Sequence, residues 1–183
     1  MNRKEFKKRL IEWSQLLCEE EASDEKASVK NIYAIIDKIE AISSSLGKKC
    51  EIKYRLKNGY GRIEYNMVGD VISGAIDFEI WKTGDFIIFE TFQITKGYGP
   101  LLYEILIEKA TEAKVCLMSD RGEVSDSARA VWDKYLSRDD IKYKQIDGDV
   151  ESSLSKCYRK DGPLVILDRL SRSKFIDFIE VRR

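Results

Sequence analysis

The stretch from residue 85 to residue 113 constrains the fold of this chain more than any other part of it. Residues 85–95 (DFIIFETFQIT) are rich in Ile, Phe and Thr and predict a buried strand, because both of the alternating faces are largely apolar. Residues 101–113 carry apolar side chains on nearly every side, as an enclosed helix does. A buried strand that turns at once into a buried helix predicts an α/β fold.

The turn between this strand and this helix predicts a site for a phosphate or pyrophosphate group. Gly97 and Gly99 permit positive φ and the close approach of a ligand, and Pro100 suits the first position of a helix. The amides around Gly97, Gly99 and Leu101 are then expected to point to one place, with the positive end of the helix dipole behind them. Lys96 precedes the glycines, where it either screens phosphate charge or is a solvated surface residue.

Ahead of this stretch, the hydrophobic pattern changes from helical to strand-like near residue 50. Apolar residues recur at helical spacing before that point and alternate with polar residues after it. Asn58-Gly59 predicts a hairpin turn, so the strands form an antiparallel meander that leads into residues 85–95. The predicted elements are helices over 2–18 and 29–47, and strands from Cys50, over 61–66 and over 71–81.

After the glycine-containing turn and its helix, the pattern alternates between strands and a helix. Residues 115–118 form a short apolar strand that is reached through a helical crossover, so it should run parallel to the strand before the turn. Ser125 is placed to cap the next helix. Residues 141–146 and 154–160 read as an antiparallel strand pair, and 161–183 as a C-terminal appendage docked on the domain.

The strand and the segment KGYGPLLYEIL that follows it resemble the pyrophosphate loop and next helix of the GNAT N-acetyltransferase superfamily. The segments VCLMSD, RGEVSDSARAVWDKYL and IKYKQID follow in the order found in compact GNAT-like proteins of tailed phages, so the resemblance covers residues 60–165. It implies one domain over 1–183, with a helical part (1–47), a sheet core (48–160) and the appendage. The sheet is expected to be mixed, mostly antiparallel and of about seven strands, with a V-shaped splay between two parallel strands.

The resemblance also implies a function. Acetyl-CoA would be the cofactor, its pantetheine arm would enter the splay, and an acyl group would pass to a primary amine of a small molecule or protein. The implied cofactor-binding residues are Ile94, Lys96, Gly97, Tyr98, Gly99, Pro100 and Leu101.

Three features depart from the superfamily's pattern. Ile94 stands three residues before the first glycine, where Gln or Arg is usual, and Trp132 stands where a tyrosine is usual. The strand that normally opens the domain is also missing. A second function therefore stays open, a GNAT-like protein without catalysis that binds a partner, such as a phage factor acting on a host protein.

The absence of histidine limits the catalytic groups available to this chain. Ser-His-Asp and Cys-His nucleophiles and His-based metal sites are excluded, so a proton must move through Glu, Asp, Tyr, Cys, Lys or water. Glu90 is the predicted base, since apolar neighbours at Phe86, Ile88, Phe92 and Ile94 would raise its pKa. The alternative is a structural, ion-paired glutamate.

Three further groups are secondary candidates. Asp77 and Glu79 are the next choices for the base. Tyr135 can substitute for the missing tyrosine as general acid, or it is a core residue with its hydroxyl at the rim. Arg121 either pairs with an acidic substrate or the ligand phosphates, or locks its own loop.

The charge balance and the cysteine content indicate which partners and which cellular compartment to expect. Lys plus Arg equals Asp plus Glu at 32 each, so no overall field attracts nucleic acid or an anionic membrane. Cys18, Cys50, Cys116 and Cys157 are far apart in the sequence, which predicts free buried thiols in a reducing cytoplasm. A homodimer or a host-protein partner is the expected form of any assembly.

Overall fold

The computed structural model describes residues 29–66, 73–93, 97–120, 122–148 and 151–182. The predicted helix over 2–18, together with Cys18, Ile94, Lys96 and Arg121, lies outside the described residues. Within the described ranges, the fold is α/β, as predicted, and no helix is both long and apolar enough to span a membrane.

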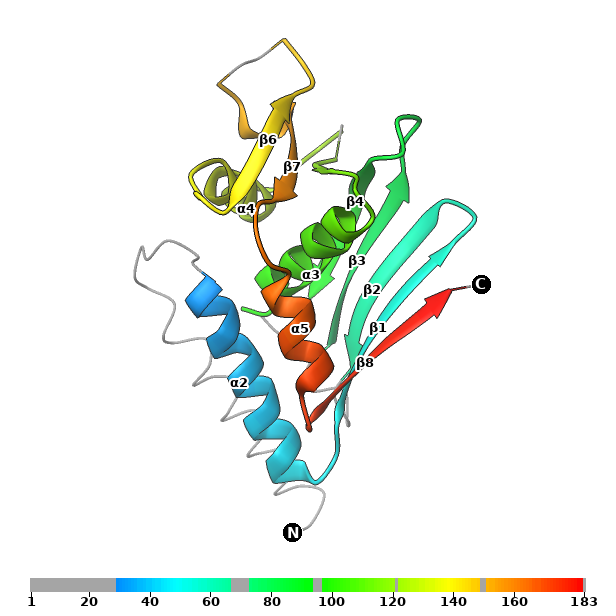
Figure 1. Ribbon diagram of the computed structural model, residues 1–183, viewed down its shortest axis with the longest axis vertical. Coiled ribbons are helices and arrows are strands. Elements are labelled where there is room, and N and C mark those ends of the chain that lie inside the picture. Colours follow the sequence, from blue (N-terminus) through cyan, green and yellow to red (C-terminus); the bar gives the residue numbers. More distant parts are fainter. Residues whose placement is uncertain (1–28, 67–72, 94–96, 121, 149–150, 183) are drawn as a thin grey trace.

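The centre of the molecule is an open, mixed sheet of eight strands in the order β6-β7-β5-β4-β3-β2-β1-β8 (Figure 1). The strands are β1 (Cys50–Lys57), β2 (Tyr60–Asn66), β3 (Ser73–Ile80), β4 (Phe86–Gln93), β5 (Leu117–Met118), β6 (Ile141–Gln145), β7 (Lys156–Lys160) and β8 (Ile176–Arg182). The helices are α2 (Val29–Leu46), α3 (Gly99–Glu112), α4 (Asp126–Leu136) and α5 (Val165–Arg172), with a short 3-10 helix η1 (Ser153–Ser155).

The first four strands form the predicted antiparallel meander. Asn58 and Gly59 join β1 to β2 with φ values of 53° and 82°, the pair of positive angles that a two-residue hairpin turn requires. β4 and β5 then pair in parallel across α3, which confirms the predicted crossover. Ser125 caps α4, since its side chain accepts a hydrogen bond from the amide of Ala128.

The C-terminal segment differs from its prediction. The described part of this segment, residues 161–182, is not an appendage, because it supplies α5 and the edge strand β8, which pairs in parallel with β1 from Cys50↔Ile176 to Leu56↔Arg182. Ile176 is buried and Phe178 packs against the core, so one side of β8 belongs to the hydrophobic interior. Among the described residues the sheet therefore has eight strands, where about seven were expected, and the C-terminal strand occupies the position beside β1.

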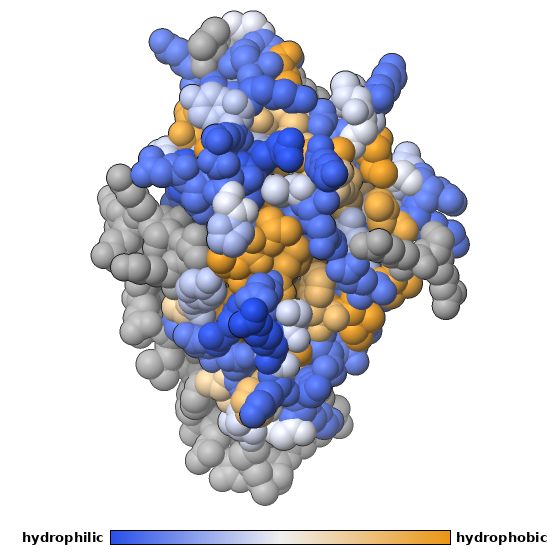
Figure 2. Space-filling view, in the orientation of Figure 1, coloured by the Kyte–Doolittle hydropathy of each residue, from blue (hydrophilic) through white to orange (hydrophobic). Residues whose placement is uncertain are grey.

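The two faces of the sheet differ in character. Helices α2, α3 and α5 lie on one face (Figure 1), where they bury residues such as Ile36, Leu101 and Ile63 in one core cluster. The view onto this side shows hydrophilic residues over most of the described surface and apolar residues mainly toward its centre and right (Figure 2). On the opposite face, β1 to β3 present paired charges, and we call these residues the charged face. They are Lys53, Arg55, Arg62, Glu64 and Asp77.

Candidate functional site

The glycine turn, residues 97–100, joins the end of β4 to the N-terminus of α3. Gly97 has a φ of +90°, a backbone conformation that residues other than glycine adopt only at an energetic cost. Tyr98 is the N-cap residue but gives no side-chain cap, and Pro100 lies in the first turn, one residue after the predicted first position, because α3 begins at Gly99. No acidic residue lies in the first turn of α3, so no carboxylate there opposes an anion.

The amide of Leu101, one of the predicted donors, is engaged within the turn. The amide of Leu101 donates to the carbonyl oxygen of Tyr98 at 3.1 Å, as often happens when the first turn of a helix tightens. The expectation that Leu101 offers its amide to a ligand is therefore wrong for this state of the turn.

Strands β4 and β5 diverge toward the end of β4 that leads into the glycine turn. They pair only at Phe86↔Leu117 and Ile87↔Met118. From Ile88 to Gln93, the edge of β4 that faces β5 has no strand partner among the described residues. The backbone groups of that edge are available to an extended ligand, which can pair with them as a further strand would.

Glu90 points to the charged face because β4 contains a bulge. The register runs through Phe78↔Ile88 and resumes at Asp77↔Glu90, which leaves Phe89 as an extra residue. An extra residue reverses the alternation of a strand, so the side chains that follow it change face. Glu90 is exposed and does not share the buried face of Ile88, so the apolar surroundings predicted for it are wrong. Its role as a base stays a prediction.

Around Glu90, the charged face carries one ion pair and one aromatic ring. Asp77 lies opposite Glu90 and pairs with Arg62 at 2.6 Å. The Arg62 guanidinium also lies 5.2 Å from the centre of the Phe92 ring. Asp77 is therefore neutralised, whereas no ion pair connects Glu90 to any other described residue. Glu79, two residues along the same strand from Asp77, is partly buried.

The predicted acid, Tyr135, lies in the core. It is 2% exposed, and its neighbour Trp132 on the same helix is 1% exposed. Burial first, and then the carboxylate of Glu104, raise the pKa of Tyr135 well above its ordinary value. Tyr135 is therefore a core residue, as the alternative expected, but its hydroxyl is buried and does not lie at the rim. The rings of Trp132 and Tyr135 both point away from solvent.

Two of the cysteines are paired. Cys116 and Cys157 form a disulfide between the start of β5 and β7, with a Cα–Cα distance of 5.6 Å, so the prediction of free thiols is wrong for this pair. The chain separation of 41 residues hid the pair from the sequence, and the antiparallel contact of β5 with β7 creates it. Cys50 is free and buried as predicted, and burial raises the pKa of its thiol to about 12.

Among the described residues, one group has the donor types of a metal site. Ligand atoms of Asp85, Cys116 and Cys157 lie within 4.8 Å of one another. Both sulfurs are used by the disulfide, so in this state the group offers a single carboxylate.

A buried charge network was not foreseen. Arg138, which follows α4, binds Glu104 of α3 and also Asp140, and Lys160 of β7 lies within 3.5 Å of Glu104, Glu108 and Asp140. These groups connect α3 with the β6–β7 part of the sheet. A signal was present in the sequence, since Glu104 and Glu108 stand among the apolar residues of 101–107 and therefore need buried partners.

Glu108 has a second role, because its carboxylate accepts hydrogen bonds from backbone amides in the first turn of α5. It accepts hydrogen bonds from the amides of Ile166 and Leu167 at 2.8–3.1 Å. Burial is the largest influence on Glu108 and raises its pKa above the ordinary value. The C-terminal segment is thus attached to α3 by a buried acceptor as well as by β8.

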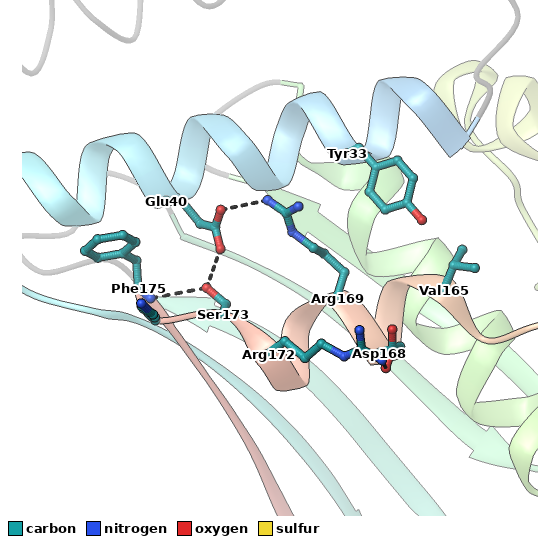
Figure 3. Close-up of a pocket in the computed structure, with 9 residues that line it drawn as sticks. Tyr33, Glu40, Val165, Asp168, Arg169, Arg172, Ser173 and Phe175 are labelled. Atoms are coloured by element: carbon teal, nitrogen blue, oxygen red, sulfur yellow. Dashed lines mark hydrogen bonds and ion pairs between the residues drawn. The ribbon is translucent and has the colours of Figure 1, made fainter.

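A pocket of about 510 Å³ lies between α2 and α5 (Figure 3). Arg169 crosses it and pairs with Asp37 at 2.6 Å and Glu40 at 2.8 Å, and Ser173 donates to Glu40. None of the lining residues belongs to β4, β5 or the glycine turn. This pocket is therefore separate from the predicted cofactor site, and its charged groups hold the two helices together.

Comparison with known proteins assigns no family to the chain. No family model, no curated protein and no solved structure matches it.

Proposed function

We propose that this protein is an N-acyltransferase that uses acyl-CoA, with acetyl-CoA as donor and a primary amine of a small molecule or protein as acceptor. The supporting observation is the parallel pair β4–β5, which stays together for two residues per strand and leads from β4 into a glycine turn at the start of a buried helix. The GNAT resemblance of the sequence links that arrangement to coenzyme A, with the sheet as the splayed GNAT-like sheet.

The glycine turn would receive the pyrophosphate of the coenzyme. Gly97 brings backbone close to the ligand without a side chain, Lys96 precedes it, and the N-terminus of α3 favours negative charge. The pantetheine arm, which carries amide groups, would pair with the free edge of β4 between Ile88 and Gln93.

The chain's own chemical task is then small. A bound acyl thioester is already activated, so the protein has to position the amine and accept its proton. Glu90 is assigned the second task, directly or through a water molecule, because it is exposed and no ion pair among the described residues occupies it.

Cofactor binding is tested with acetyl-CoA in calorimetry and thermal unfolding. A ligand at ~100 times its dissociation constant stabilises the folded state by roughly 2.7 kcal/mol, which for a chain of this size raises Tm by about 5–10 °C. Gly97→Val should abolish this shift. Gly84→Val is the matched control, since Gly84 has a similar φ of +86° in the β3–β4 turn and shares only the backbone strain. Loss of binding in both variants, or in neither, would count against the proposed phosphate site.

Catalysis is tested with Glu90→Gln, which nearly preserves shape and removes the basic group. Acyl transfer to a confirmed acceptor should fall by ~10² to 10⁴, with coenzyme affinity and Tm little changed. Glu79→Gln, on the neighbouring strand, should keep wild-type turnover. Wild-type thioester consumption by Glu90→Gln would remove this residue from the mechanism.

A second candidate is a binding protein of the same fold that has no activity, such as a phage factor that acts on a host protein. The burial of Trp132 and Tyr135 favours it, because α4 then offers no exposed phenol to reprotonate a thiolate. A protein that binds CoA but consumes no thioester with any amine offered would support this candidate over the enzyme.

A further inference from the structure

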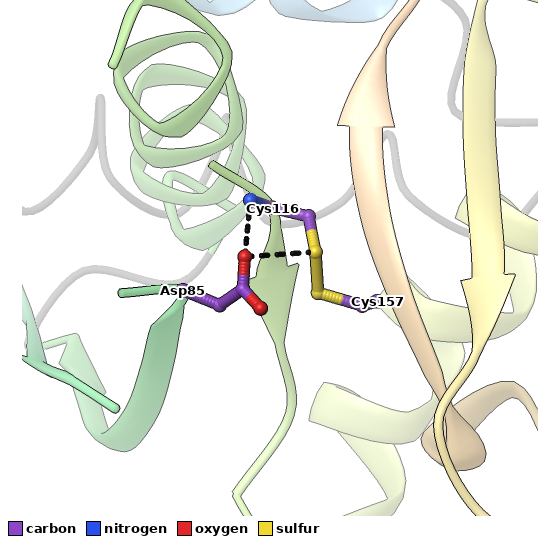
Figure 4. Close-up of side chains that lie close together, drawn as sticks. All are labelled: Asp85, Cys116 and Cys157. Carbon is purple, nitrogen blue, oxygen red and sulfur yellow. Dashed lines mark hydrogen bonds between the residues drawn. A yellow bond between two sulfur atoms is a disulfide. The ribbon is translucent and has the colours of Figure 1, made fainter. Parts of the chain in front are cut away.

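The disulfide has an unusual neighbour, the carboxylate of Asp85 (Figure 4). Asp85 precedes β4, Cys116 precedes β5 and Cys157 lies in β7, and the three residues are 7%, 3% and 1% exposed. Asp85 Oδ1 accepts a hydrogen bond from the amide of Cys116 at 3.0 Å and lies 3.2 Å from Cys116 Sγ. The carboxylate therefore faces one sulfur of the bond directly.

That contact suits a thiol better than a disulfide. A sulfur in a disulfide carries no proton, so Asp85 Oδ1 meets only sulfur lone pairs. After reduction, the Cys116 S–H can donate to the same oxygen across the same short distance, and hydrogen bonds to charged acceptors are among the stronger ones. Asp85 therefore favours the dithiol state over the disulfide.

The carboxylate is held in its charged form by its other contacts. Burial alone would raise the pKa of Asp85, but the amide of Cys116, the hydroxyl of Thr83 at 2.8 Å and the ammonium of Lys144 at 3.5 Å together lower it below its usual range. Thr83 and Lys144 bind the second oxygen, Oδ2, which leaves Oδ1 turned to the sulfur.

We propose that Cys116 and Cys157 are a reversible thiol–disulfide couple, with Asp85 accepting a hydrogen bond from the Cys116 thiol in the reduced state. A thiol reductant of the glutathione class supplies the electrons. Its thiolate attacks one sulfur, the Cys116–Cys157 bond breaks, and a mixed disulfide forms. A second reductant thiol then displaces the protein, so two thiols are oxidised to one disulfide while two protons end on Cys116 and Cys157.

The place of the couple in the sheet gives it a structural consequence. β5 contributes two residues to the sheet, and it is the link between β4 on one side and β7 on the other. The disulfide adds a covalent connection across this narrow part, from β5 to β7. Reduction removes that connection, and the β6–β7 hairpin is then held by packing, hydrogen bonds and the buried charges of Arg138 and Lys160.

The test equilibrates the folded, full-length protein with reduced and oxidised glutathione at defined ratios. Free thiols are trapped by alkylation, and peptide mass spectrometry reads Cys116 and Cys157 separately from the other cysteines. The wild-type pair should pass from disulfide to dithiol within the range that glutathione covers. Asp85→Asn should shift the equilibrium toward the disulfide by about 10- to 100-fold, or about 30 to 60 mV. Asp77→Asn, an aspartate of the charged face, should leave it unchanged.

Three results would overturn the proposal. The wild-type pair, measured without any variant, can stay oxidised at every glutathione ratio while the protein is folded, which would make it a permanent structural bond. A folded Asp85→Asn protein can titrate like wild type or shift toward the dithiol. Reduced wild-type protein can take up one equivalent of zinc, measured by elemental analysis after dialysis, which would make the three residues a metal site.

Discussion

Removal of the Cys116–Cys157 bond should lower the free energy of unfolding by an amount that the chain separation predicts. The bond closes a loop with a sequence separation of 41 residues. In the chain-entropy relation, a loop of that length restricts the unfolded state by about 13 cal/mol/K, or about 4 kcal/mol at room temperature. For a chain of this size, that loss corresponds to a fall in Tm of about 8–16 °C.

The contact with Asp85 makes the prediction finer, because two kinds of bond-free protein should differ. The double variant Cys116→Ala/Cys157→Ala has neither disulfide nor thiol and should lose the full ~4 kcal/mol. Reduced wild-type protein retains a Cys116 thiol that can donate to Asp85, and a hydrogen bond to a charged acceptor recovers about 1.5–3 kcal/mol. The expected order of stability is oxidised wild type, reduced wild type, double variant.

Urea denaturation with and without reductant measures all three species. The double variant should be insensitive to reductant, which makes it the control for effects of the reductant itself. An oxidised wild type less than about 1 kcal/mol more stable than the double variant would refute the loop-closure reasoning. Reduced wild type equal to the double variant would refute the thiol contact with Asp85 and leave the loop estimate intact.

Two further predictions concern stability. A hydrogen bond from Arg138 is the largest influence on the Asp140 carboxyl and lowers its pKa, so the charged carboxylate stabilises the folded state above the unfolded-state pKa, and this stabilisation is lost as the pH falls through the folded-state pKa. Asp140→Asn lacks the carboxyl, so its free energy of unfolding should fall less than that of wild type on acidification. Urea denaturation at several pH values measures the difference. Gly61→Ala would place a Cβ 2.1 Å from the buried ring of Phe78 and should cost about 1–3 kcal/mol, whereas Gly148→Ala meets no atom within 4 Å and should be near neutral in the same assay; equal effects would contradict the overpacking explanation.

The local elements of this fold were readable from the sequence because each has a local physical cause. Asn58-Gly59 specifies a hairpin because both residues tolerate positive φ. Ser125 specifies the start of α4 because its hydroxyl accepts from the amide of Ala128. The order of strand, glycine turn and buried helix, from which the cofactor site was predicted, could also be read from local sequence.

The face of the sheet on which Glu90 lies could not be predicted from the sequence of β4. Strict alternation places it beside Ile88, but a one-residue bulge at Phe89 turns it to the charged face. A bulge depends on how β3 and β4 fit one another, and a single strand's sequence does not record its partner's register.

Contacts between distant segments were decided by tertiary structure alone. The bond between Cys116 and Cys157 and the pairing of Arg138 with Glu104 join residues 41 and 34 positions apart. The pairing of β8 with β1 spans the chain from residue 50 to residue 176. Sequence periodicity reports which side of an element is apolar, because that is a property of neighbouring residues. It does not report which other element will cover that side, since this depends on the packing of the whole chain, and both the redox pair and the edge strand of this protein arise from that packing.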